Sequence, residues 1–439
     1  MKQINGYSKL SKEEKIDWVV SNYFSGDVSV KQELLSYWHE DVAVQKIFDD
    51  FCENTLTNMY MPYGVAPNFL INGSWYCLPM AIEESSVVAA MANAGKFWGE
   101  RGGFHATIIG TTKIGQVHFT YVGDKQILFE QFPVLKKELL EGAKYLTVNM
   151  DARGGGVLDV ELIDMTAFEA DYFQLKVSFE TCDSMGANFI NSVLEEYATL
   201  LKEYVTRNNF PGTLKVILSI VSNYTPDCLV RAWVECPIED LGIVGGLQPR
   251  EFAEKVRMAV RIAEVDPHRA TTHNKGIYNG VDAVIIATGN DFRAVEACGH
   301  TYAARNGRYS SLTHCSLEND TFKFWIDLPL AVGTVGGLTQ LHPLVKRSLQ
   351  ILGNPDAKQL MQFAAVAGLA QNFAALRALT TVGIQQGHMK MHLLNILNYL
   401  EATEREKEQA LAYFKDKVVS FTTTRVLLEQ LRSASKEVE

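Results

Sequence analysis

The sequence has few cysteines and no C-x-x-C pair. Its seven cysteines are odd in number and scattered, at positions 52, 77, 182, 228, 236, 298 and 315. This pattern argues against a disulfide framework and against a structural zinc site. Unpaired thiols are typical of reducing compartments, so we expect a cytoplasmic protein. The first residues, MKQINGYSKLSKEEK, also lack the apolar stretch of a secretory signal.

The sequence also lacks a long uninterrupted apolar run. The strongest candidate, FAAVAGLAQNFAALRALTTVGI at 363–384, contains Gln371, Asn372 and Arg377 and is built mainly from alanine and glycine. A membrane-spanning helix needs about 20 predominantly apolar residues with few or no charges. We therefore expect a buried, tightly packed helix here and no membrane contact.

The sequence has fewer basic residues than acidic ones. Lysine and arginine number 41 against 51 aspartates and glutamates, which gives a net charge of −10. Such a chain has no general attraction to nucleic acid or to anionic lipid, so that any cationic patch would suit small anionic ligands. The sequence contains no G-x-G-x-x-G, which disfavours a standard Rossmann dinucleotide site.

The chain is long enough for several domains, and its pattern predicts an α+β protein. Its 439 residues suggest about two to four domains, with 47% hydrophobic residues to form their cores. Strands alternate with helices between about 112 and 225, which predicts a compact α+β unit. The other expected elements are helices within 8–60, 85–100, 249–264 and 401–414, a hairpin at Asn72-Gly73, a helix within 138–147, a helix at 188–207, a strand at 282–291 and a helix from Asp291.

The segment TCDSMGANF at 181–189 places small residues where a strand ends and a helix begins. Gly186 and Ala187 would let backbone N–H groups approach phosphate oxygens at the positive end of the helix dipole. The alternative is an ordinary helix capped by Asp183.

A second segment, HRATTHNKGIYNGVDAVIIATGND at 268–291, holds Arg269, Lys275, Asn279 and Asp291 around an apolar stretch. A lysine paired with a carboxylate stays charged and can stabilise an oxyanion. The alternative is two ordinary turns, N-K-G and G-N-D, on either side of a strand.

Two further motifs have similar alternatives. Glu83 and Glu84 precede a helix, where they could stabilise its dipole or, with a raised pKa, donate a proton. His388 and His392 have H-x-x-x-H spacing, but the zincin motif needs glutamate after the first histidine, and Met389 stands there. We expect no metal site. His388 beside Gly387 is either a mobile general acid or an exposed histidine.

Together these segments resemble hydroxymethylglutaryl-CoA (HMG-CoA) reductase, and more closely its soluble bacterial class II form. The resemblance covers nearly the whole chain. Its motifs, in order, are ENTLTNMYMPYGVAPNFLINGSWYCLPMAIEESSVVAA, ARGGGVLDVE, DSMGANFINS, DPHRATTHNKGIYNGVDAVIIATGNDFRAVEA, GLAQNFAALRAL and GIQQGHM.

The resemblance implies a role for each candidate residue. Its catalytic set would be Glu84, Lys275, Asp291 and His388. Lys275 would stabilise each developing oxyanion with Asp291 orienting it, Glu84 would supply a proton, and His388 would protonate the departing thiolate. The substrate-binding residues would be Ser86, Asn223, Arg269 and Asn279. The cofactor-binding residues would be Asp183, Met185, Gly186, Ala187, Asn188 and Thr147.

The resemblance also implies an architecture and partners. A large helical and β substrate domain (1–111 and 226–382) would carry an inserted ferredoxin-like NAD(P)-binding domain (112–225) and a C-terminal helical flap (383–439). HMG-CoA, mevalonate and CoA would be the small-molecule partners, and a homodimer, able to associate further, would have its active sites at the interface. Two rival hypotheses are a CoA-dependent acyltransferase with His388 as base and a non-catalytic acyl-CoA sensor.

Two positions affect the backbone at Glu84 and the choice of cofactor. Ser85 stands where the family has proline in E-E-P-S, which removes a backbone restriction on Glu84. Thr147 stands where a relative that prefers NADH would carry aspartate, and a carboxylate there would repel the ribose phosphate of NADPH. Lys144 and Tyr145 could join Thr147 around that phosphate, with Asp151 the acidic residue nearby. We expect NADPH as the preferred cofactor, with NADH as the alternative.

Overall fold

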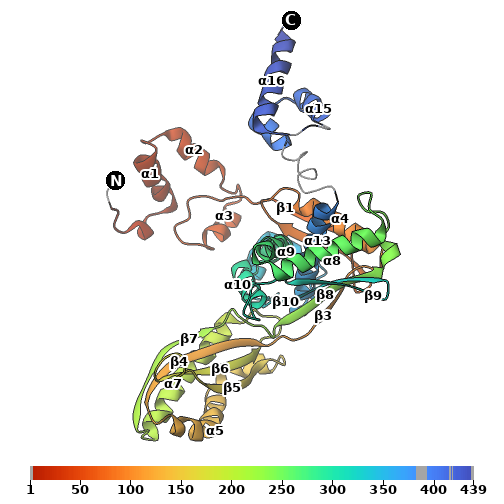
Figure 1. Ribbon diagram of the computed structural model, residues 1–439. Helices are drawn as coiled ribbons and strands as arrows, with labels where there is room; N and C mark the ends of the chain where they lie inside the picture. Colours follow the sequence, from red (N-terminus) through yellow and green to blue (C-terminus); the bar gives the residue numbers. More distant parts are fainter. Residues whose placement is uncertain (1–2, 382–392, 415–416, 418, 437–439) are drawn as a thin grey trace.

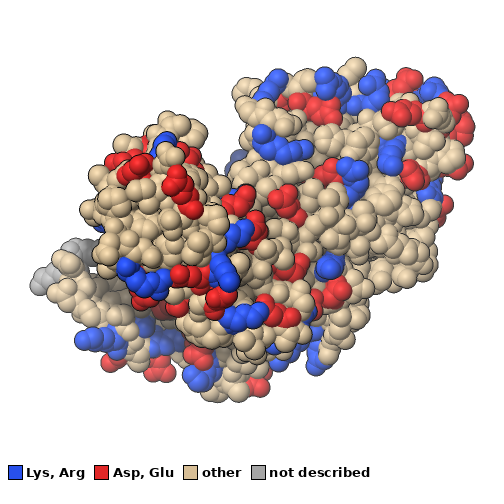
Figure 2. All heavy atoms as spheres, turned by 90° about the horizontal axis from the view of Figure 1, so that it is seen from below, with Lys and Arg blue, Asp and Glu red and all other residues tan. Residues whose placement is uncertain are grey.

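The protein consists of a central body with three peripheral units (Figure 1). The computed structural model describes residues 3–381, 393–414, 417 and 419–436. In the view of Figure 1 the N-terminal helices lie to the left of the body, a small α/β unit lies below it, and the last helices stand above it. On the face in Figure 2, acidic and basic side chains are interspersed.

The N-terminal unit is helical, as the sequence predicts. Ser11 accepts a hydrogen bond from Glu14 N and Glu14 returns one to Ser11 N, so that this capping box starts the first α-helix. The unit meets the body through Phe48 and Phe51, whose rings pack on His342. Its elements are η1 (Tyr7–Lys9), α1 (Lys12–Tyr23), α2 (Val28–Ser36) and α3 (Val42–Asp49).

The body packs helices against a hairpin and a four-stranded sheet. Asn72-Gly73 forms the expected hairpin turn, with Asn72 and Gly73 both at positive φ. The four-stranded sheet has the order β3-β8-β10-β9. The strands are β1 (Tyr63–Ile71), β2 (Ser74–Ala81), β3 (His105–Ile108), β8 (Leu229–Pro237), β9 (Thr313–Glu318) and β10 (Thr321–Pro329). The helices are α4 (Val87–Gly99), η2 (Ile238–Leu241), α8 (Pro249–Val265), α9 (Pro267–Ala287), α10 (Phe292–Ala303), α11 (Leu338–Leu341), α12 (Pro343–Ile351) and α13 (Ala357–Thr380).

The small unit is a β-α-β-β-α-β arrangement with strand order β5-β6-β4-β7, which is the ferredoxin-like order. All of its pairings are antiparallel. Its elements are β4 (Lys113–Gly123), α5 (Lys125–Gly142), α6 (Lys144–Asp151), β5 (Gly156–Asp164), β6 (Tyr172–Glu180), α7 (Ala187–Arg207) and β7 (Gly212–Val221). It has a hydrophobic core of its own, separate from that of the body.

The C-terminal unit forms a third, smaller core around Leu397, Phe414 and Leu428. It comprises a helical segment at 393–399, α15 (Glu404–Tyr413) and α16 (Phe421–Lys436). Arg432 of α16 donates to Glu406 of α15 at 2.8 Å. The mixed fold class is therefore confirmed, while the exact domain boundaries stay a prediction.

The structure corrects the prediction for 268–291. Instead of the N-K-G turn and the strand, residues 267–287 form one 21-residue helix, α9, with Asp266 as N-cap and Pro267 in its first turn. The turn expected at G-N-D is present, at Thr288-Gly289, between α9 and α10. The glycines of α9 do not break the helix. A Cβ on Gly280 would lie 2.5 Å from the Ala367 carbonyl oxygen, so Gly280 permits close packing on α13. Tertiary contact thus overrides the local turn preference.

Two smaller predictions also change. The helix expected at 138–147 is two helices, α5 and α6, which meet at Ala143. The Ala-rich segment is the buried helix α13, as predicted. In the part of the chain that the structure describes, no helix combines the length and hydropathy needed to cross a bilayer.

Candidate active site

A cleft of about 940 Å³ lies between the start of α4, α9 and α13. It gathers five of the residues singled out from the sequence, namely Glu84, Ser86, Arg269, Lys275 and Asn279. Three of these come from α9, where Lys275 and Asn279 lie one turn apart on one face. The helix that was expected to be turns is therefore the element that aligns the polar groups.

Lys275 and Glu84 form the centre of this cluster. Lys275 Nζ donates to Glu84 Oε2 at 2.8 Å, and Asn279 Nδ2 lies 3.4 Å from the same oxygen. The side chains of Lys275 and Glu84 are 62% and 42% exposed. An ammonium and a carboxylate are thus held together at an open surface, within reach of a carbonyl oxygen placed between them.

Ser86 has a strained backbone next to this pair. It is the N-cap of α4 with φ 75°, a left-handed conformation that is uncommon for a residue with a side chain. Its side chain makes no capping hydrogen bond. Such strain is frequent at binding sites, and here it leaves the Ser86 hydroxyl available to a ligand.

Arg269 supplies a second positive charge to the cleft. No carboxylate lies within 4 Å of its guanidinium among the described residues, and burial lowers its pKa. Behind it, His273 is buried next to Thr313, and burial, with the Arg269 charge, lowers the pKa of His273 to about 3. The imidazole is therefore neutral, and Arg269 is the group that can receive a ligand carboxylate.

The segment 181–188, predicted from the sequence to bind the cofactor, is anchored to the body. Asp183 Oδ1 accepts from Ala357 N at 2.9 Å, at the start of α13, and Asp183 O accepts from Thr334 N at 2.9 Å. Gly186 follows at φ 90° and starts α7 without a side-chain cap. The first N–H groups of this 21-residue helix, those of Ala187 and Asn188 included, are therefore available to phosphate oxygens.

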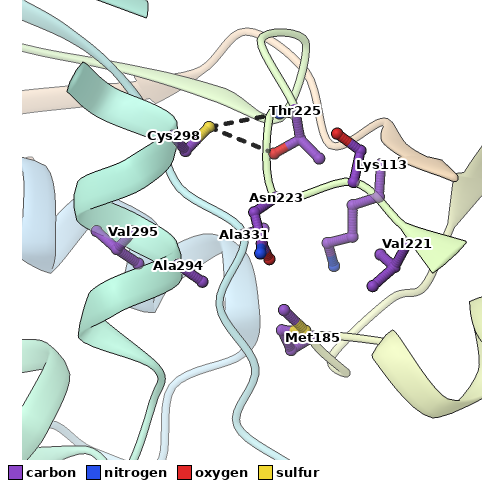
Figure 3. Close-up of a pocket in the computed structure, with 10 residues that line it drawn as sticks. Lys113, Met185, Val221, Asn223, Thr225, Ala294, Val295, Cys298 and Ala331 are labelled. Carbon is purple, nitrogen blue, oxygen red and sulfur yellow. Dashed lines mark hydrogen bonds between the residues drawn. The ribbon is translucent and has the colours of Figure 1, made fainter. Parts of the chain in front are cut away.

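A second, small cavity of about 10 Å³ lies where the small sheet meets the body (Figure 3). Met185 and Asn223, both predicted from the sequence, line it. Ala294 and Val295 of α10 face it from the body. These two predicted residues are therefore separate from the five that line the large cleft.

Asp291 lines neither the cleft nor the small cavity, but it caps α10, the helix whose residues Ala294 and Val295 line the small cavity. Its Oδ1 accepts from Arg293 N at 3.1 Å and Ala294 N at 3.2 Å. From Lys275 to the end of α9 at Ala287 the helix rises about 18 Å. Within one chain Lys275 therefore contacts Glu84, and the role of Asp291 in orienting Lys275 stays a prediction.

Thr147 is less accessible than the sequence suggested. It is 5% exposed, and its hydroxyl donates to Asp151 Oδ2 at 2.8 Å. Lys144 binds the same oxygen at 2.6 Å and is mostly exposed, whereas the Tyr145 hydroxyl donates to Glu196. Lys144 is thus the group at this position most able to meet a phosphate. His388, the fourth catalytic candidate, lies outside the described residues.

Sequence reasoning missed several residues that line these cavities. Gln371, Asn372 and Arg377 of α13 face the cleft, and Lys113 lines the small cavity. The signal was present for the first three, because polar residues are unusual in an Ala-rich buried helix. The sequence pattern indicated Lys113 less clearly, because it is simply a lysine at the start of an apolar strand.

The comparisons with known proteins agree on one family. The family model described as Hydroxymethylglutaryl-coenzyme A reductase matches residues 13–393. The 3-hydroxy-3-methylglutaryl-coenzyme A reductase of Archaeoglobus fulgidus is 39% identical over 98% of this chain and 95% of its own. The probable reductase of Borreliella burgdorferi is 31% identical over 92% and 93%.

A solved structure gives the same result. The class II reductase of Streptococcus pneumoniae, bound to NADPH in open conformations, has a TM-score of 0.71 and 37% identity, and covers 87% of this chain and 100% of its own. Family model, relatives and structure thus extend over nearly the whole chain, and they include the helices that build the cleft. The chain belongs to the hydroxymethylglutaryl-coenzyme A reductase family.

Proposed function

We propose that this enzyme catalyses the NAD(P)H-dependent four-electron interconversion of HMG-CoA and mevalonate plus CoA, through mevaldehyde. The observation that carries this proposal is the pairing of Lys275 with Glu84 in a cleft of about 940 Å³, beside Arg269, for which the described residues provide no carboxylate partner. In this cleft Lys275 can contact a carbonyl oxygen, Glu84 can supply a proton and Arg269 can bind a substrate carboxylate.

In this proposal Lys275 stabilises the negative charge on the carbonyl oxygen during both reductions. Preorganised positive charge at a developing oxyanion is usually the largest catalytic term. Glu84, at hydrogen-bond distance from Lys275, supplies a proton to that oxygen from its protonated carboxyl form, and this leaves the carboxylate paired with Lys275. Arg269, Ser86 and Asn279 hold the carboxylate and hydroxyl of the acyl group, and Asn223 contacts it from the other cavity. His388 protonates the CoA thiolate.

A bound nicotinamide cofactor supplies the hydride. The residues present fit such a group, because the N–H groups at the start of α7 have no side-chain cap and follow the anchored segment 183–186. Asp183, Met185 and Gly186 shape that segment, and Ala187 and Asn188 offer donors to the phosphates.

The test is oxidation of NADPH, followed at 340 nm, when HMG-CoA is added to the purified protein. We expect two NADPH consumed per HMG-CoA and release of one thiol. A CoA-dependent acyltransferase would release thiol without loss of absorbance, and an acyl-CoA sensor would do neither. Either of those results would overturn the proposed reaction.

We further propose that the active enzyme is a homodimer with its sites at the interface. Lys275 and Glu84 are too exposed in one chain for a site that must exclude water. Asp291 lies too far along its own chain to help them. A second subunit that presents its Asp291 and its small cavity to the cleft would supply both. Exposed apolar side chains, such as Met59 at 98% between α3 and β1 and Trp75 at 62% on β2, are candidates for this interface.

Cofactor choice yields a separate prediction. If NADPH places its ribose phosphate at α6, Lys144→Met should lower kcat/KM for NADPH several-fold, because it removes an exposed cation that now meets only Asp151. The value for NADH should change little. Lys137→Met, on the exposed face of α5, is the matched control. An equal loss with both cofactors would show that the phosphate binds elsewhere.

We propose that the enzyme is cytoplasmic. All seven cysteines are unpaired in the described structure, which suits a reducing compartment.

A further inference from the structure

Lys113 is a buried lysine at the junction of the small sheet and the body. It is the first residue of β4, and it is 4% exposed. Its Nζ donates to Thr181 Oγ1 and, at 2.8 Å, to Ser184 O. Thr181 Oγ1 donates to the same carbonyl oxygen at 2.6 Å. The ammonium therefore closes a triangle of hydrogen bonds inside the turn that leads into α7.

The charge of Lys113 has no direct counter-charge. No carboxylate lies within 4 Å of its Nζ among the described residues, although Glu180 and Asp183 are in the neighbourhood. Burial lowers the pKa of Lys113, and these carboxylates oppose the effect. A buried cation without an ion pair costs stability. Folding alone therefore gives no reason for a lysine at this position.

The turn that Lys113 holds is the predicted cofactor segment. Asp183 ties the segment to the body, through Ala357 N and Thr334 N. Lys113 ties it to the small sheet. Loss of either anchor would free Met185 and Gly186 to move relative to α7.

Lys113 also faces the small cavity. An ammonium has three donor hydrogens, and Thr181 and Ser184 accept two of them. Figure 3 shows its side chain extending between Val221, Met185 and Asn223. The third hydrogen and the positive charge are therefore presented where the predicted cofactor and substrate residues meet.

We propose that Lys113 is a positioning residue for the nicotinamide cofactor: it fixes the segment 181–186 and keeps a positive charge beside Met185, so that the reduced cofactor binds more tightly than the oxidised one. The physical reason is that the nicotinamide ring is neutral when reduced and positively charged when oxidised. A fixed cation nearby repels only the oxidised form. This inference rests on the proposed function.

The test compares binding of the two cofactor forms by full-length protein. NADPH affinity is measured by fluorescence titration and NADP⁺ affinity by displacement, after circular dichroism has verified folding. For Lys113→Met we expect NADPH affinity to fall about tenfold or more. NADP⁺ affinity should fall much less, so that the preference for the reduced form drops by roughly fivefold. KM for HMG-CoA should stay near its normal value.

Two further variants separate charge from structure. Thr181→Val removes one acceptor and keeps the ammonium, so it should weaken both cofactor forms by the same factor. It also serves if Lys113→Met fails to fold. Lys176→Met, on β6 of the same sheet and more exposed, should change neither affinity.

Unchanged NADPH affinity in Lys113→Met, or in Thr181→Val, would overturn the positioning role. Equal losses of NADPH and NADP⁺ in Lys113→Met would overturn the role of the charge. Failure of the reaction itself would be seen separately, because wild-type protein would then not oxidise NADPH with HMG-CoA.

Discussion

Lys275→Ala is expected to abolish reduction of both HMG-CoA and mevaldehyde. In the proposed mechanism the same ammonium, held by Glu84 at 2.8 Å, faces the carbonyl oxygen in both reductions, so that both steps should be slowed. Removal of one preorganised oxyanion donor typically lowers the rate roughly a hundred- to thousandfold. The effect should appear in kcat, measured at 340 nm with each substrate in turn.

Stability should hardly change in this variant. The Lys275–Glu84 pair is exposed, and exposed ion pairs contribute little to folding. Lys255→Ala, which breaks an exposed ion pair with Glu251 on the neighbouring helix α8, is the control and should keep full activity. Near-normal turnover of Lys275→Ala would remove the basis of the mechanism.

The second large effect is recovery of activity in mixed dimers. Asp291→Asn should be almost inactive by itself, although asparagine can still cap α10 and keep the fold. Lys275→Ala and Asp291→Asn should restore each other when they share a dimer. One of the two sites then combines an intact Lys275 from one subunit with an intact Asp291 from the other.

The measurement uses the two variants with different affinity tags, co-expressed and purified through both tags. The purified mixed dimer should show about half the activity of the wild-type dimer, since one site of two is intact. A site built within one chain would leave both sites of the mixed dimer damaged. Absence of recovery in a verified dimer would therefore refute the interfacial site.

The sequence by itself predicted much of the local secondary structure and the types of side chain in the candidate site. The helices of the N-terminal unit, the hairpin at Asn72-Gly73 and the strands of the small unit depend on short-range patterns, and the structure confirms them. The sequence also predicted the family, because several long motifs of that family occur in the same order in this chain.

Only the tertiary structure decided how the candidate residues are grouped. The N-K-G sequence at 274–276 predicts a turn, yet residues 267–287 form one helix, α9, in which Gly280 packs closely on Ala367. That helix brings Lys275 and Asn279 to Glu84 and carries Asp291 away from them. The buried Thr147 hydroxyl likewise donates to Asp151. The buried Lys113 donates to Ser184, in the turn predicted to bind the cofactor. Local sequence specifies which groups are present, whereas contacts between distant segments determine which of them can meet.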